Sequence, residues 1–323
     1  GYSGMLAPGT YEIGFDSSSG GGLVPGWLPV DGNNTGILAT GVVVSRPPPN
    51  ELDIDVHTAP VSGVVTFNGA PLPAGCTWYL RSPNVASAAF AVDAAGAYAG
   101  RVPPGTYDLL YQGAGSGSTC PMNTLATLKR GIVVSAAGTT VPPVDILSVQ
   151  LAGQLKLNGA ALSDPADDGT LSLHTADGDN ITLGKLSAGG FSAHVIPGTY
   201  DVYFELSNSA VAMLAPINLH GKLASVTLTP GGITSLDIDV RSTLISGTVK
   251  IGGSFVDKEY DGGRLWLGDP KGFPAGTPLS WTSTGKFSAR VIPGSYDLYY
   301  QGTSPSALAP FNTSVKLGCF EVQ

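Results

Sequence analysis

Charged residues are scarce in this chain of 323 residues, and that scarcity excludes several classes of partner. Only 12% of the residues are charged, and 16 Lys and Arg against 24 Asp and Glu give a net charge of −8. Because this surplus of negative charge repels phosphate groups, we exclude nucleic acid as a partner. Long apolar runs are also missing, and no stretch approaches the roughly 18 consecutive apolar residues that cross a bilayer. We therefore expect no membrane span in this segment, and an opening Gly1 without a signal-like run indicates a processed or partial chain.

Cysteine is almost absent, and its spacing excludes a cysteine-based metal site. The chain has three cysteines, Cys76, Cys120 and Cys319, and no CxxC motif. Cys76 and Cys120 fall inside one repeat unit, as shown below, so a disulfide between them and a pair of buried thiols are both compatible with the sequence. Cys319 has no partner in its own unit, and we expect it to be free or paired with another chain or segment.

The strongest signal that is present is an internal repeat. The chain is rich in Gly (45) and Pro (25), a composition typical of short strands joined by turns. One phrase occurs four times at intervals of 96, 93 and 96 residues, and each copy stands six residues after an aromatic residue. The four copies are Pro8-Gly9-Thr10-Tyr11, Pro104-Gly105-Thr106-Tyr107, Pro197-Gly198-Thr199-Tyr200 and Pro293-Gly294-Ser295-Tyr296.

Two further phrases set the boundaries of the repeat units. A Ser/Ala-Gly phrase opens three units at residues 62, 152 and 246, and Leu-Asp-Ile-Asp-Val occurs at residues 52–56 and 236–240. We expect complete β-sandwich repeats at residues 57–149 and 150–240. Residues 1–56 are expected to form the second half of such a repeat, and residues 241–323 a repeat that lacks its last strand.

The phrases predict local structure. Alternating large apolar residues after each Tyr indicate strands with one buried face, and Pro-Gly predicts the tight turn before each of them. Asn68-Gly69 and Asn158-Gly159 predict two-residue hairpin turns. We interpret Leu236 to Val240 as an antiparallel strand with Asp237 and Asp239 on its solvated side.

The order of these phrases resembles that of the carboxypeptidase regulatory-like domain, a transthyretin-like sandwich. In this sequence the order is a Ser-Gly-x-Val opening strand, then Asn-Gly-Ala-Pro-Leu-Pro, then Pro-Pro-Gly-Thr-Tyr, and last a closing Val-x-Ile-x-Val strand. The resemblance implies a secreted accessory or structural module without catalytic residues of its own. The predicted fold is all-β, with tandem seven-stranded transthyretin-like or Ig-like sandwiches arranged as a rod. Linkers of five residues between units predict restricted tumbling, and the array would reach on the order of 120 Å.

A search for catalytic chemistry finds none. The four histidines have unrelated contexts, and no Gly-x-Ser-x-Gly elbow occurs, so we predict that the chain is not an enzyme and has no cofactor. Acidic residues in equivalent loops are weak candidates for a Ca²⁺ site, with solvated turn residues as the alternative. These candidates are Asp164, Asp167 and Asp168 in one unit and Asp257, Glu259 and Asp261 in the next. Trp27 and Trp281 are candidate glycan contacts, whereas Trp78 and Trp266 occupy equivalent strands and are expected in the core.

Three functions fit these observations. The first is an extracellular or cell-surface structural protein that forms a stalk or a filament by end-to-end packing, with strand complementation between subunits or continuation in a longer array. The second is an adhesin or carbohydrate-binding module that contacts surface glycans. The third is an accessory segment of a larger secreted hydrolase.

Overall fold

The computed structural model shows an all-β chain built of tandem β-sandwiches. It describes residues 6–17, 34–45, 53, 57–73, 75–82, 87–90, 92–113, 120–207, 213–231, 233–251, 253–255, 263–268, 277–279, 285–302 and 315–323. The chain divides into two compact units. The first comprises residues 1–148 with Asp177–Asp179 and His194–Pro197, and the second comprises the remaining residues from Val149 to Gln323.

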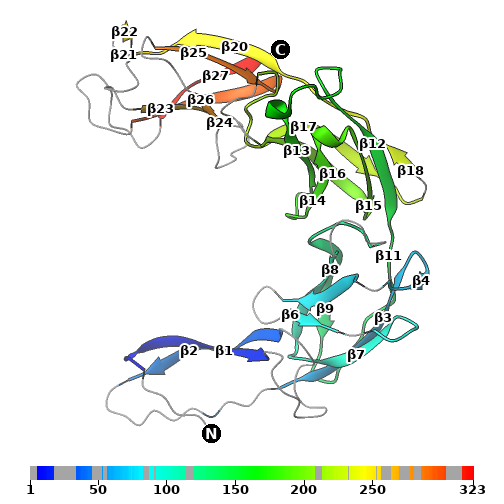
Figure 1. The fold of residues 1–323 in the computed structure, drawn as a ribbon. Helices are drawn as coiled ribbons and strands as arrows, with labels where there is room; N and C mark the ends of the chain where they lie inside the picture. The colour runs from blue at the N-terminus through cyan, green and yellow to red at the C-terminus, as the bar shows by residue number, and fades with distance from the viewer. Residues whose placement is uncertain are drawn as a thin grey trace. The chain divides into compact units, whose positions relative to one another are not determined.

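Two sheets form the first unit (Figure 1). A six-stranded sheet has the order β1-β2-β6-β5-β8-β9, and in a second sheet β3 pairs with β4, β7, β10 and β11. The strands are β1 (Gly9–Ser17), β2 (Asn34–Val44), β3 (Ala59–Phe67), β4 (Ala70–Pro71), β5 (Thr77–Arg81), β6 (Ser87–Ala89), β7 (Ala97–Val102), β8 (Gly105–Gln112), β9 (Ala126–Val134), β10 (Thr139–Thr140) and β11 (Val144–Ile146).

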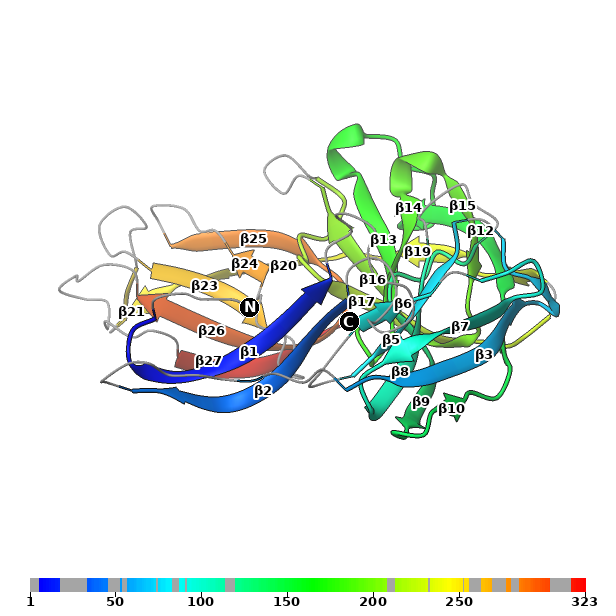
Figure 2. The same cartoon turned by 90° about the horizontal axis from the view of Figure 1, so that it is seen from below.

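The strands of the expected half unit extend the first of these sheets. β1 and β2 form a long antiparallel ribbon (Figure 2), and β2 continues the sheet through the pairing of Thr35 with Ser87 on β6. Alternating residues of the complete sandwich enclose the core, in which Trp78, Tyr107 and Tyr111 are at most 2% exposed. Residues 57–148 therefore supply the core, and β1 and β2 extend one edge of the six-stranded sheet.

The second unit holds two further sets of sheets. β12 pairs with β15, β18 and β19, opposite the sheet β14-β13-β16-β17; later in the chain follow the pairs β20-β25 and β21-β22 and the sheet β24-β23-β26-β27. The elements up to residue 240 are β12 (Val149–Leu157), η1 (Pro165–Asp167), β13 (Gly169–His174), β14 (Asn180–Lys185), η2 (Leu186–Ala188), β15 (Gly190–Val195), β16 (Gly198–Leu206), β17 (Gly221–Leu228), β18 (Ile233–Ser235) and β19 (Ile238–Val240). The later strands are β20 (Thr243–Thr248), β21 (Lys250–Ile251), β22 (Ser254–Phe255), β23 (Gly263–Gly268), β24 (Thr277–Leu279), β25 (Lys286–Val291), β26 (Gly294–Gly302) and β27 (Val315–Val322).

The predicted hairpin turns are confirmed. Asn68 and Asn158 have φ values of 49° and 51°, and Gly69 and Gly159 follow at 75° and 83°. Positive φ at both central residues is the mark of a type I′ turn, which Asn-Gly favours. The turns connect β3 to β4 and Leu157 to Ala160.

The predicted direction of the Leu236 to Val240 strand is wrong. β18 and β19 pair with β12 in parallel, with Leu155 opposite Ile238 and Leu157 opposite Val240, and β11 pairs with β3 in the same way. The strand returns to the first sheet after a long excursion through the other sheet, and such a crossover connection produces a parallel neighbour. Apolar and polar residues do alternate as predicted, because Ile238 and Val240 are buried while Asp237 is exposed.

Candidate functional site

The turns before three Tyr-led strands are held by the tyrosine itself. The Tyr107 hydroxyl donates to the carbonyl of Pro103 at 2.7 Å, and Tyr296 donates to Ile292 and Tyr11 to Ala7, both at 2.5 Å. Each acceptor lies four residues earlier, directly before the proline of the Pro-Gly turn. The repeated Pro-Gly-Thr/Ser-Tyr phrase therefore encodes one fixed turn that presents the backbone of the residue before proline.

In the second unit this turn receives a buried asparagine from the preceding sandwich. The Asn218 side chain is 4% exposed, and its Oδ1 accepts a hydrogen bond from the backbone N–H of Ile292 at 2.9 Å. Its Nδ2 donates to the Tyr296 hydroxyl at 3.0 Å. One residue before it, the N–H of Ile217 donates to the carbonyl of Arg290 at 2.9 Å. Asn218 thus joins the residues after β16 to the turn between β25 and β26.

The same arrangement occurs inside the first unit. Asn123 is fully buried, and its Oδ1 accepts from the N–H of Ile196 at 2.7 Å. The N–H of Met122 donates to the carbonyl of His194 at 2.7 Å, as Ile217 does to Arg290. Asp179 provides an additional acceptor, because its Oδ1 takes the N–H groups of Thr124 and Leu125 at 2.8 Å. We call the contact between Asn123 or Asn218 and the turn of Ile196 or Ile292 the asparagine clamp.

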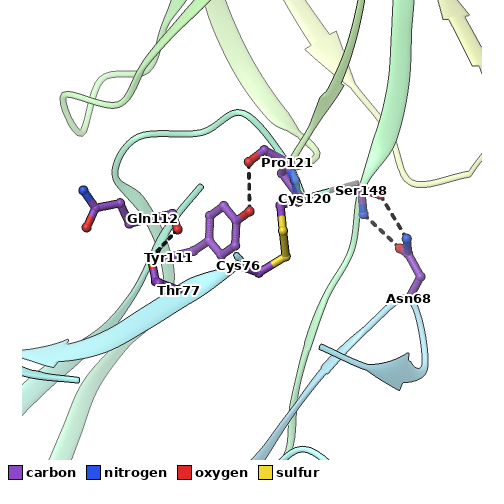
Figure 3. Close-up of a disulfide and its surroundings, with 8 residues drawn as sticks. All are labelled: Asn68, Cys76, Thr77, Tyr111, Gln112, Cys120, Pro121 and Ser148. Atoms are coloured by element: carbon purple, nitrogen blue, oxygen red, sulfur yellow. Dashed lines mark hydrogen bonds between the residues drawn. A yellow bond between two sulfur atoms is a disulfide. The ribbon is translucent and has the colours of Figure 1, made fainter. Parts of the chain in front are cut away.

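A second contact fixes the residue at which the chain leaves a sandwich. In the first unit Asn68 and Ser148 exchange hydrogen bonds at 2.9 and 3.0 Å (Figure 3). In the second unit Ser242 donates its N–H to Asn158 Oδ1 at 2.9 Å, and its hydroxyl donates to the carbonyl of Leu214 at 2.5 Å. The asparagine of each Asn-Gly turn therefore restrains the linker as well as the hairpin.

The two loops that carry the clamp asparagines are anchored in different ways. In the first unit Cys120, at 0% exposed, forms a disulfide with Cys76, with an S–S distance of 1.99 Å. The Tyr111 hydroxyl donates to the carbonyl of the next residue, Pro121, at 2.8 Å (Figure 3). The disulfide is one of the two states that the sequence left open, and it fixes the loop that ends in Asn123.

In the second unit a buried carboxylate anchors the loop that carries Asn218. Asp167 is 1% exposed, and its Oδ1 accepts the N–H groups of Met213, Leu214 and Ala215 at 2.7 to 2.8 Å. Ala215 stands three residues before Asn218, as Cys120 stands three residues before Asn123. An aspartate thus replaces a disulfide at the equivalent loop.

This geometry does not support calcium binding at Asp164, Asp167 and Asp168. Asp164 accepts from the N–H of Ala166, and Asp168 accepts from the N–H and the hydroxyl of Ser187. In the part of the chain that the structure describes, no three His, Cys, Asp or Glu side chains gather as metal ligands. The second set of candidates, Asp257, Glu259 and Asp261, lies outside the described residues.

The core position predicted for Trp78 is confirmed, but the one predicted for Trp266 is wrong. Trp78 lies opposite Tyr111 and is 2% exposed, in the core as expected. In β23 it is Leu265 that lies opposite the equivalent Tyr300, so Trp266 points to the other face, where it is half-buried and stacks on Tyr299 at 4.7 Å. The strands are equivalent, but the tryptophans are one residue out of register, which reverses the face. Trp27 and Trp281 lie outside the described residues, and Cys319 is a free, exposed cysteine on β27.

Sequence reasoning missed the clamp asparagines, although a signal for them exists. Pro, then Met, Ile or Phe, then Asn occurs at residues 121–123, 216–218 and 310–312, at intervals of 95 and 94 residues. These intervals match the period of the Pro-Gly phrase. The third copy lies outside the described residues.

Comparisons with known proteins do not identify a function for this chain. No protein-family model and no curated protein matches the sequence. Among solved structures, the Bacillus anthracis TIE protein is 10% identical at a TM-score of 0.22, over 90% of this chain and 55% of its own, so that the chain spans about half of its length. A streptococcal ancillary pilin is 8% identical over 81% and 95%, at a TM-score of 0.25. The minor pilin GBS52 of Streptococcus agalactiae is 10% identical over 60% and 98%, at a TM-score of 0.29. Likenesses with scores this low carry no argument. Among the described residues no helix is long and apolar enough to span a membrane.

Proposed function

We propose that this protein is a non-enzymatic structural protein of the cell surface or extracellular space, a stalk of successive carboxypeptidase regulatory-like sandwiches joined by short linkers. The observation that carries the proposal is the asparagine clamp, in which the Oδ1 atoms of Asn123 and of Asn218 each accept the backbone N–H of the residue before a Pro-Gly turn. A repeated, buried polar contact costs stability unless every group is paired, so it serves specificity of docking more than simple adhesion of surfaces.

The contacts at residue 242 support the same function. Ser242 is held by Asn158 from one sandwich, while the Arg290 guanidinium of the following sandwich donates to its carbonyl at 3.3 Å. Both neighbours thus contact the linker, which removes the freedom that a flexible linker would otherwise have. A protein that bears load or holds a ligand at a distance needs this restriction, whereas a set of independent binding modules does not.

The disulfide agrees with an extracellular location. Disulfides persist in oxidising compartments, and Cys76–Cys120 lies beside the loop of a clamp, where its loss would loosen the docking surface. The net charge of −8 disfavours a negatively charged partner such as nucleic acid.

Small-angle scattering of the full chain tests the stalk. We expect a maximum dimension of about 90 to 120 Å for three successive sandwiches of about 30 to 40 Å each. The variant Asn218→Ala with Arg290→Ala should retain the β-sheet circular dichroism but give a broader distribution of dimensions. A compact particle, or a double variant with an unchanged distance distribution, would refute the proposal. Glycan binding by the wild-type chain would instead favour the adhesin alternative.

A further inference from the structure

Strand β27 forms an outer edge of its sheet, and the fold itself leaves this edge open. The sheet has the order β24-β23-β26-β27, and among the described strands β27 pairs with β26 alone. The corresponding sheets of the two complete sandwiches end in the same way, at β9 and at β17. After each of these strands the chain crosses to the other sheet, where β10 pairs with β3 and β18 pairs with β12. A further strand can therefore add to β27 without displacing any described strand.

A bulge in β27 determines which of its residues share the outer face of the sheet. The register with β26 shifts once, where Leu317 is the extra residue. On the outer face the Lys316 ammonium group lies 2.7 Å from Asp297 Oδ2, and the Ser295 hydroxyl donates to Glu321. When the bulge is counted as one position, three polar residues follow one another on this face at equal intervals of two positions. These residues are Lys316, Cys319 and Glu321.

This spacing makes the outer face of β27 complementary in charge to itself. If two β27 strands pair in antiparallel about a two-fold axis at Cys319, Lys316 of each chain lies opposite Glu321 of the other. Opposite charges that face one another across an antiparallel pair favour the pairing, and like charges disfavour it. The same axis places the two copies of Cys319 opposite one another, with Cα atoms about 4.5 or 5.5 Å apart. A disulfide spans either separation.

The other face of β27, which is turned to the core, is complementary in shape in the same register. Gly318 of each chain lies opposite Phe320 of the other. A Cβ atom added at Gly318 would meet nothing within 4 Å, so the space above this glycine is open to an aromatic ring. The third sandwich already pairs an aromatic residue with a glycine across two strands, because Phe287 lies opposite Gly247 and its ring fills the place of a Cβ. Charge and shape therefore favour one and the same register.

The equivalent edges of the complete sandwiches lack this complementarity. On β17 the three positions carry Lys222, Ser225 and Thr227, so a two-fold pairing would set lysine opposite threonine. On β9, Gly131 has a φ of 69° and takes the place of Cys319, and the register with β8 shifts twice. Irregular edges of this kind resist the addition of a strand. Among the three edges, the self-complementary pattern is specific to β27.

We propose that β27 pairs in antiparallel with β27 of a second copy of this chain, about a two-fold axis at Cys319, and so joins two chains side by side. Cys319 is a free, exposed cysteine, whereas Cys76 and Cys120 form the disulfide that is typical of an oxidising compartment. By exchange with a small-molecule disulfide, the two Cys319 thiols form one disulfide and the small molecule is reduced to two thiols. This inference goes beyond the proposed stalk, since it concerns a lateral contact between chains and does not depend on how successive sandwiches are joined.

The first experiment measures how fast the full chain forms a disulfide-linked dimer in a buffer of oxidised and reduced glutathione. Non-reducing gels give the rate, and peptide mapping identifies the Cys319 pair. The matched control combines Cys319→Ser with Ser225→Cys, which moves the thiol to the equivalent exposed position on β17. We expect the wild-type chain to form the dimer at least about tenfold faster than the control, because only β27 brings two thiols together. Equal rates would make Cys319 an ordinary exposed thiol and would overturn the proposal.

Charge substitutions test the register. Glu321→Lys or Lys316→Glu sets like charges opposite one another in a dimer of identical chains, so each variant alone should form the disulfide at least about tenfold more slowly than wild type. A mixture of the two variants restores opposite charges at both positions, and mixed dimers should form at nearly the wild-type rate. Circular dichroism checks that both variants keep their β-sheet. Mixed dimers that form no faster than dimers of either variant alone would refute the antiparallel register.

Hydrogen exchange of the wild-type chain covers the case in which a charge variant does not fold. With a reductant present to prevent the disulfide, the amides of β27 should exchange more slowly at high than at low protein concentration, and those of β17 should exchange at the same rate. Dimers without protection of β27 would place the contact elsewhere and overturn the proposal. Because scattering of the dilute monomer tests the stalk separately, the stalk and the lateral pairing can fail independently.

Discussion

Replacement of Asn218 by alanine should destabilise the clamp by about 2 to 4 kcal/mol. The change removes two hydrogen bonds, one to the backbone N–H of Ile292 and one to the Tyr296 hydroxyl. A buried donor without a partner costs about 1 to 3 kcal/mol, and a lost hydrogen bond to a neutral hydroxyl about 0.5 to 1.5 kcal/mol. Ile292 itself is 5% exposed, so water does not readily replace the lost acceptor.

Native-state hydrogen exchange is the suitable assay, because a chain of several sandwiches need not unfold in one step. At about 1.4 kcal/mol per tenfold change, exchange of the Ile292 amide should accelerate on the order of 30-fold to 1,000-fold in Asn218→Ala. The variant Tyr296→Phe removes both hydrogen bonds of the tyrosine hydroxyl, to Asn218 and to the carbonyl of Ile292, and leaves the bond between Asn218 and the Ile292 N–H. The double variant then measures how strongly the two residues are coupled. Acceleration below about threefold would show that the clamp is not energetically important and would remove the main support for the stalk.

Three further predictions follow from the structure. Substitution of both Cys76 and Cys120 by alanine should lower the stability of the first unit by about 4 kcal/mol, since the disulfide spans 44 residues, and proteolysis kinetics should show early cleavage near residue 120 with the second unit still protected. Burial raises the pKa of Tyr98 and of Tyr107 to about 12. Because the folded-state pKa lies above the unfolded value of 10, the stability that each tyrosine contributes is complete below pH 10 and is lost as the pH rises toward 12. The melting temperature should therefore fall over that range, while absorbance at about 295 nm reports the ionisation. A melting scan with and without EDTA should give the same midpoint, since the carboxylates of Asp164, Asp167 and Asp168 are bonded to N–H and hydroxyl groups, and a lower midpoint with EDTA would restore the calcium hypothesis.

The parts of the fold that sequence predicted are those set by local chemistry. Asn68-Gly69 and Asn158-Gly159 need positive φ, and only a few residue types adopt it readily, so the turn type follows from two letters. The alternation in residues 236–240 likewise follows from one buried face. The direction of that strand does not, because it depends on the path of the 80 or so intervening residues, and alternation is the same in parallel and antiparallel pairs.

The candidate site was harder to predict because it depends on distant pairs. Asn123 and Ile196 are 73 residues apart, and a single asparagine in a loop is ordinarily explained by turn formation. Comparison of the repeats with one another reveals it, since Pro followed by Met, Ile or Phe and then Asn recurs with the period of the Pro-Gly phrase. Trp266 illustrates the opposite error: an equivalent strand was identified correctly, but a shift of one residue placed the side chain on the other face.

Pro103 shows that the hydrogen bond of the turn tyrosine and the asparagine clamp are independent features. Pro103 stands at the position of Ile196 and Ile292, and Tyr107 still donates to its carbonyl, so the turn is built as in the other sandwiches. Proline has no N–H, however, and cannot donate to an asparagine as Ile196 and Ile292 do. The tyrosine hydrogen bond therefore belongs to the turn itself, at Tyr11, Tyr107 and Tyr296, while the residue before Pro-Gly determines whether the turn can accept a clamp asparagine. The sequence at this one position thus distinguishes a turn that accepts a neighbour in this way from a turn that does not.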